Sequence, residues 1–187
     1  MINQIFNNSI FKILTLFSLS PGSRFNRKNI KEKTRTNNMP LDNALTKLMS
    51  GSILKRMENY YSINLEDEHA KQIIEIVSKE YKNLRELPLD VYFLLVDLTD
   101  ELAQIKNIQV YLFGSYSKLV YSDKSDVDIA IISNGSLDKK RIEKIIAKVE
   151  KSYKKNVEVH YFDGLTFYKN EKDPLVRGII KDGIRLI

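Results

Sequence analysis

The stretch FGSYSKLVYSDKSDVDIAI, residues 113–131, constrains the fold more than any other part of the sequence. It places Asp126 and Asp128 at the start of an apolar run that is typical of a buried strand. A carboxylate beside a protein core is costly unless a partner compensates its charge, and a cation is the usual partner. Because alternate residues of a strand point to the same side, we predict that the two aspartates share one face and bind a cation there.

The second half of the chain predicts an α+β fold. Apolar runs at residues 108–113, 127–133 and 157–162 are typical of strands, and a helix is expected at 137–154. Gly114 and Ser115 follow the first strand, where glycine permits close backbone approach and the serine can bind a phosphate. Glu158 lies in the third strand between apolar residues, with His160 on the same face. Mg²⁺ in proteins is usually coordinated by one or two carboxylates together with the phosphates of a substrate.

These motifs resemble the nucleotidyltransferase family of the DNA polymerase beta type, and in particular its minimal nucleotidyltransferases. The family pattern is an apolar residue, Gly-Ser, about ten residues, Asp-apolar-Asp, and a later apolar-acid-apolar strand. Here the pattern is Phe-Gly-Ser at 113–115, Asp-Val-Asp at 126–128 and Val-Glu-Val at 157–159. The resemblance covers roughly residues 88–187.

The resemblance implies a nucleotidyltransferase domain at residues 88–187, a mixed β-sheet flanked by helices. It implies transfer of a nucleoside monophosphate from a nucleoside triphosphate, expected to be ATP, to an acceptor hydroxyl, with Mg²⁺ or Mn²⁺ as cofactor. Catalytic and metal-binding roles fall on Asp126, Asp128 and Glu158, and nucleotide-binding roles on Gly114, Ser115, Lys118 and Ser125. Some minimal nucleotidyltransferases are antitoxins that modify a partner toxin, so a protein acceptor is one expectation.

The sequence departs from the family after Gly-Ser. Many minimal nucleotidyltransferases have Arg-Ala-Arg-Gly there, whereas this chain has Tyr-Ser-Lys-Leu at residues 116–119. Two alternatives to an active enzyme therefore stay open. One is a DNA-binding transcriptional regulator with a nucleotide-sensing or inactive transferase fold, and the other is a structural adaptor in which the acids are idle.

The first part of the chain carries the positive charge. Residues 1–64 contain 10 Lys and Arg against 3 Asp and Glu, and the remaining residues contain 20 against 21. The pattern of helix, short helix, helix and hairpin over residues 5–65 resembles a winged helix-turn-helix, which we assign to residues 1–65. Such a basic domain is a candidate for binding duplex DNA, although a packing or dimerisation module is the alternative. The candidate DNA-binding residues are Asn43, Thr46, Lys47, Lys55 and Arg56.

Residues 66–87 predict a connector helix. The apolar residues of this helix are alternately four and three positions apart and so form a seam along one side. Such a seam favours either packing on the same chain or a homodimer. The seam consists of Ala70, Ile74, Val77, Tyr81 and Leu84. The chain has no cysteine and no apolar run of the ~20 residues that span a bilayer, so we expect a cytoplasmic protein without a membrane segment.

Overall fold

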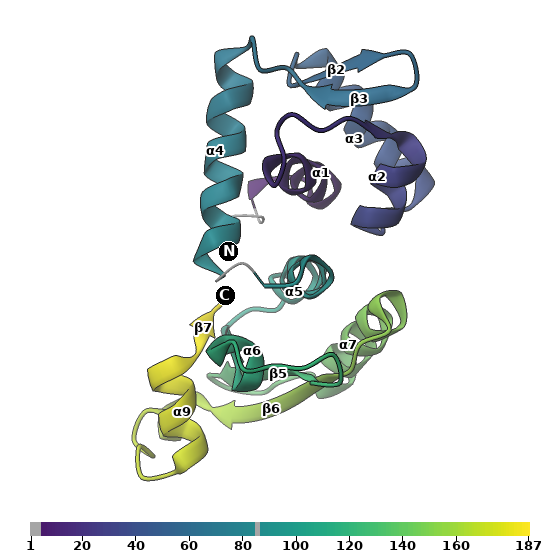
Figure 1. Cartoon of the computed structure of the whole chain (residues 1–187). Helices are drawn as coiled ribbons and strands as arrows, with labels where there is room; N and C mark the ends of the chain where they lie inside the picture. Colours follow the sequence, from purple (N-terminus) through teal and green to yellow (C-terminus); the bar gives the residue numbers. More distant parts are fainter. Residues whose placement is uncertain (1–4, 85–86) are drawn as a thin grey trace. The chain divides into compact units, whose positions relative to one another are not determined.

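The computed structural model describes residues 5–84 and 87–187 (Figure 1). Contacts divide the chain into two compact units, Ile2–Glu86 and Leu87–Ile187. This division differs from the predicted one at 1–65, 66–87 and 88–187, because the helix after the hairpin belongs to the N-terminal unit. Among the described residues, no helix combines the length and the apolar character that crossing a membrane requires.

The N-terminal unit has four helices and a small antiparallel sheet in its described part, with strand order β1-β3-β2. The elements are α1 (Asn8–Ser18), β1 (Phe25–Asn26), α2 (Arg27–Thr34), α3 (Asn38–Ser50), β2 (Leu54–Met57), β3 (Tyr60–Ile63) and α4 (Glu68–Asn83). Three helices followed by a hairpin is the order that the sequence predicted. The two-residue strand β1, which pairs with β3, was not predicted.

Local sequence explains these helix boundaries. The side chain of Asn26 accepts a hydrogen bond from the backbone N–H of Asn29, so it caps α2. Asp67 caps α4 in the same way through Ala70. Helix α3 ends at Ser50, with Gly51 as its C-cap, and buries one apolar face. That face consists of Leu41, Ala44, Leu45 and Leu48.

Helix α4 packs against α1 of the same unit. Of the predicted seam, Ala70, Ile74, Val77 and Leu84 are buried, whereas Tyr81 is half-buried. The structure thus shows the seam packed on its own chain. A homodimer through residues 66–87 would need this seam exposed, so the structure does not favour it.

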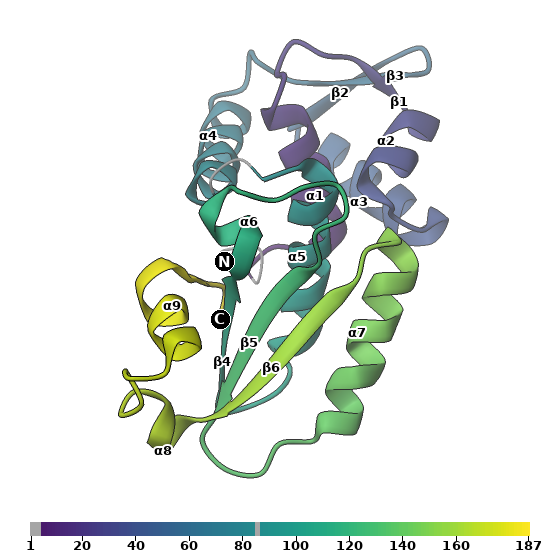
Figure 2. The same cartoon turned by 60° about the horizontal axis from the view of Figure 1, so that its bottom comes forward.

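The C-terminal unit has a four-stranded mixed sheet with strand order β6-β5-β4-β7. Figure 2 shows β4, β5 and β6 side by side. Strands β5 and β6 are parallel, and the pairs β4–β5 and β4–β7 are antiparallel. The elements are α5 (Leu89–Leu102), β4 (Ile108–Phe113), α6 (Gly114–Lys118), β5 (Val127–Ser133), α7 (Lys139–Tyr153), β6 (Val157–Asp163), α8 (Gly164–Phe167), α9 (Pro174–Asp182) and β7 (Ile184–Arg185). The mixed sheet flanked by helices confirms the predicted α+β class.

Both faces of β5 are apolar beyond its first residues. Ala130 and Ile132 belong to a buried cluster with residues of α8 and α9, including Phe167. Val127, Ile129 and Ile131 are fully buried and, by the strand period, lie on the opposite face. Asp128 therefore shares its face with Ala130 and Ile132, at the end of β5 where the strand begins.

Candidate functional site

Gly114 makes the turn from β4 into α6 with a backbone conformation that suits glycine. Its φ is +70°, and a Cβ atom at this position would lie 1.9 Å from Oδ2 of Asp128. No side chain can occupy that space while Asp128 stays in place. The close approach predicted for this glycine is thus to a carboxylate of the neighbouring strand.

Asp128 is the centre of the candidate site. In the sheet register it lies opposite Phe113 of β4 and opposite Glu158 of β6. The backbone N–H of Ser115 also donates a hydrogen bond to the Asp128 carboxylate. Residues 113–115, Asp128 and Glu158, which are far apart in the sequence, therefore come together at one edge of the sheet.

The pKa of Asp128 is raised above its ordinary value. Partial burial is the largest cause, followed by the negative charge of Glu158, and the charge of Asp126 acts in the same direction. The Ser115 hydrogen bond opposes the shift. Asp126 immediately precedes β5 and is half-buried. Glu158 and Asp126 therefore each interact electrostatically with Asp128.

The Glu158 carboxylate has a close partner on its own strand. Its Oε1 lies 3.0 Å from Nε2 of His160, and the His160 ring packs edge-on against Phe113 at 5.3 Å between centroids. Over residues 5–84 and 87–187, no three His, Cys, Asp or Glu side chains are grouped closely enough to hold a metal ion. Metal binding by all three acids remains a prediction.

Two other predicted nucleotide-binding residues have structural partners. Lys118, at the end of α6, forms an ion pair with Asp182 at 3.6 Å. The Ser125 hydroxyl accepts a hydrogen bond from the backbone N–H of Ser122 at 2.8 Å and closes a turn just before Asp126. Both residues lie on the segments that flank Gly114 and Asp126, so each stays a candidate.

The predicted DNA-binding residues lie on α3 and the β2–β3 hairpin. Asn43, Thr46 and Lys47 are exposed and line one hollow of the surface. Lys55 forms an ion pair with Glu66 at 2.9 Å, and Arg56 donates to the Glu58 carbonyl oxygen at 2.9 Å. Arg56 is exposed, whereas the ion pair offsets the positive charge of Lys55.

Sequence reasoning missed the partner of Asp42, an acid on the exposed side of α3. Arg27 of α2 binds the Asp42 carboxylate through two hydrogen bonds, of 2.6 and 2.8 Å. This bidentate pair holds the pKa of Asp42 below its ordinary value. No local signal could have revealed the pair, because its members are 15 residues apart on different helices.

Comparison with known proteins supports the assignment of the C-terminal part. Residues 95–187 match the family model described as a nucleotidyltransferase domain. No curated protein matches the chain. The family match confirms the predicted nucleotidyltransferase domain in this part of the chain and does not extend over the N-terminal unit.

Proposed function

We propose that the C-terminal unit transfers a nucleoside monophosphate from a nucleoside triphosphate to an acceptor hydroxyl and releases pyrophosphate. One observation carries the proposal. The Asp128 carboxylate fills the space left by Gly114, accepts the Ser115 N–H and interacts with Glu158 and Asp126. A phosphate-binding turn and a set of carboxylates at one sheet edge are the parts that phosphoryl transfer needs.

Asp126 and Asp128 would hold Mg²⁺ or Mn²⁺. The donors fit such an ion, since they are carboxylate oxygens. Partial burial, and after it the negative charges of Glu158 and Asp126, raise the pKa of Asp128, and a cation would offset these unfavourable terms. Mg²⁺ in such sites binds one or two carboxylates and is completed by substrate phosphates, so a preformed group of three ligands is not required. When bound, the ion would neutralise charge on the phosphates.

Gly114 and Ser115 would hold the triphosphate. The Ser115 N–H already donates to Asp128, so the Ser115 hydroxyl and the backbone N–H groups that follow it are the donors left for a phosphate. Lys118 would add a cation after leaving Asp182, and Ser125 would line the opposite side. ATP is the proposed triphosphate.

Glu158 would accept the proton of the acceptor hydroxyl. Its carboxylate is more than half exposed, with a side-chain exposure of 58%, and is held by His160. An incoming hydroxyl can therefore reach it. The variant Glu158→Gln should lower transfer, and it should raise the metal-free melting temperature because one of three repelling charges is removed. A lower metal-free melting temperature together with full transfer activity would exclude this role.

The transfer itself is tested by labelling. The full-length protein is incubated with Mg²⁺, a cell extract and each nucleoside triphosphate, labelled in parallel experiments at the α- or γ-phosphate. Nucleotidyl transfer places the α-label on an acceptor, whereas the γ-label leaves as pyrophosphate. The acceptor is proposed to be a hydroxyl on a partner protein, as in an antitoxin that modifies its toxin. The variant Asp126→Asn/Asp128→Asn is the control and should give no label.

For the N-terminal unit, we propose a winged helix that binds duplex DNA or a partner protein in the cytoplasm. The Arg27–Asp42 pair supports DNA binding, because it neutralises the acid on the exposed side of α3. Asn43, Thr46, Lys47 and Arg56 would then face DNA, and Lys55 would contribute after release from Glu66.

The alternative is a DNA-binding regulator whose C-terminal unit senses a nucleotide. The Lys118–Asp182 pair favours it, since the one basic residue of the Tyr-Ser-Lys-Leu segment is already bound within the protein. Binding of Mg²⁺ and ATP without any labelled acceptor, together with a change in DNA affinity on binding, would select this alternative.

A further inference from the structure

Residues 119–125 form the loop that joins the turn at Gly114 to Asp126. The loop begins at Leu119, which has a left-handed backbone (φ 58°), and Leu119 and Val120 are both exposed. The Val120 N–H donates to the Ser115 carbonyl oxygen at 3.0 Å, and the turn from Ser122 to Ser125 closes the other end. The loop is thus tied at one end to Ser115 and at the other end to the residues that directly precede Asp126.

Lys155, in the turn between α7 and β6, contacts the middle of this loop. Its Nζ donates to the backbone carbonyl oxygen of Asp123 at 2.9 Å and lies 5.3 Å from the centre of the Tyr116 ring. Tyr116 directly follows Ser115 and is only 2% exposed. Its ring stacks on Tyr121 of the loop at 4.6 Å between centroids and 16° between planes.

Lys155 thus joins three segments through one ammonium group. The contacts link the start of β6, helix α6 and the loop before Asp126. In the part of the chain that the structure describes, no carboxylate forms an ion pair with Lys155. Its positive charge is therefore offset by a carbonyl dipole and an aromatic face.

We propose that Lys155 is a positioning residue for nucleotide binding. By holding Asp123 and Tyr116 together, it fixes the loop so that Ser115 and Asp126 are placed for the triphosphate and its metal. The effect on nucleotide binding rests on the proposed function, whereas the restraint that Lys155 places on the loop can be measured without any nucleotide.

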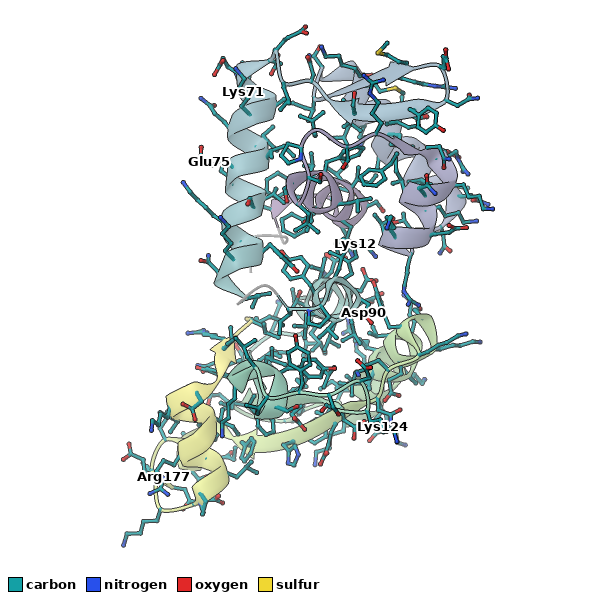
Figure 3. All side chains as sticks on the ribbon, in the orientation of Figure 1. Lys12, Lys71, Glu75, Asp90, Lys124 and Arg177 are labelled. Atoms are coloured by element: carbon teal, nitrogen blue, oxygen red, sulfur yellow. The ribbon has the colours of Figure 1, made fainter. Side chains whose placement is uncertain are left out.

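Trypsin tests the hold on the loop, because Lys124 lies at its exposed tip (Figure 3). Cleavage after Lys124 in the native full-length protein is followed by mass spectrometry. Lys155→Met keeps the aliphatic stem and loses the donor and the charge, whereas Lys155→Arg keeps both. Lys154→Met is the matched control, since Lys154 is an exposed neighbour of the same charge. Lys155→Gln is the second variant if Lys155→Met fails to fold.

Loss of a charged donor and a cation–π contact should speed cleavage after Lys124 by about fivefold or more. Calorimetry with Mg²⁺ and a non-hydrolysable ATP analogue should show weaker binding by a similar factor, with the melting temperature only a few degrees below that of the parent. Lys155→Arg should restore both quantities, and Lys154→Met should match the parent.

An unchanged rate of cleavage after Lys124 in Lys155→Met would show that Lys155 does not restrain the loop. Faster cleavage with unchanged analogue affinity would overturn the positioning role. A parent protein that binds no analogue would instead defeat the proposed function, and the cleavage rates would still decide whether Lys155 holds the loop.

Discussion

Replacing Gly114 by alanine should destabilise the C-terminal unit for two separable reasons. Alanine in the left-handed region costs roughly 1–2 kcal/mol. The new Cβ would also lie 1.9 Å from Oδ2 and 2.6 Å from Cγ of Asp128, so that the carboxylate must move away. Moving it breaks the bond from the Ser115 N–H, and hydrogen bonds to charged groups contribute about 1.5–3 kcal/mol.

The two terms together predict a loss of about 3 kcal/mol in the free energy of unfolding, with the second term at its lower end because Asp128 is only partly buried. For a unit of about 100 residues, each 1 kcal/mol lowers the melting temperature by about 4–8 °C. Gly114→Ala should therefore melt about 12–24 °C below the parent in the transition that belongs to this unit.

Circular dichroism on the full-length protein measures this loss, and two comparisons separate its causes. Gly135 also has a positive φ, of +115°, but an added Cβ there meets no atom within 4 Å, so Gly135→Ala reports backbone strain alone. In a protein that also carries Asp128→Ala, most of the clash is absent. The loss in the free energy of unfolding caused by Gly114→Ala should then approach the backbone-strain contribution of roughly 1–2 kcal/mol. If Gly114→Ala costs the same with and without Asp128, the reasoning is refuted.

Three further predictions concern charge. Asp126→Asn/Asp128→Asn should abolish the coupled binding of Mg²⁺ and ATP while keeping the fold, and equal binding in calorimetry would exclude the metal assignment. The raised pKa of Asp128 means that the native state holds this proton more tightly than the unfolded state, so stability falls as pH rises from 3.8 through the raised value. Asp128→Asn without metal should therefore be more stable than the parent at neutral pH, and this advantage should vanish in melts below pH 3.8. Lys47→Ala/Arg56→Ala in the full-length protein should reduce the slope of log affinity for duplex DNA against log salt concentration by about two. An unchanged slope in gel-shift titrations would show that DNA binds a different surface.

The regular elements were predictable because their sequences are strongly periodic. The observed β4 coincides with the predicted strand at 108–113, β5 with 127–133, and β6 extends the prediction by one residue. The parallel register of β5 and β6 places Asp128 opposite Glu158, the two acids that the family pattern pointed to on separate strands.

What the sequence could not predict depends on short elements and distant contacts. Helix α6 has five residues, too few to show a helical period, so the sequence did not predict it. The Lys155 contact to Asp123 spans 32 residues, and nothing near Lys155 distinguishes it from the many exposed lysines. Such contacts follow from the packing of elements, which local patterns do not encode.

The order of strands along the chain has a consequence for synthesis on the ribosome. The antiparallel pair β4–β5 needs only the short connection through α6, whereas the parallel pair β5–β6 needs the crossover through α7. Pairing across a crossover requires a longer loop closure and is intrinsically slower. A growing chain should thus present Gly114, Asp126 and Asp128 before Glu158 has emerged. An early chain would then carry the proposed metal ligands but not Glu158, so under the proposed function transfer should begin only when the last third of this unit has emerged.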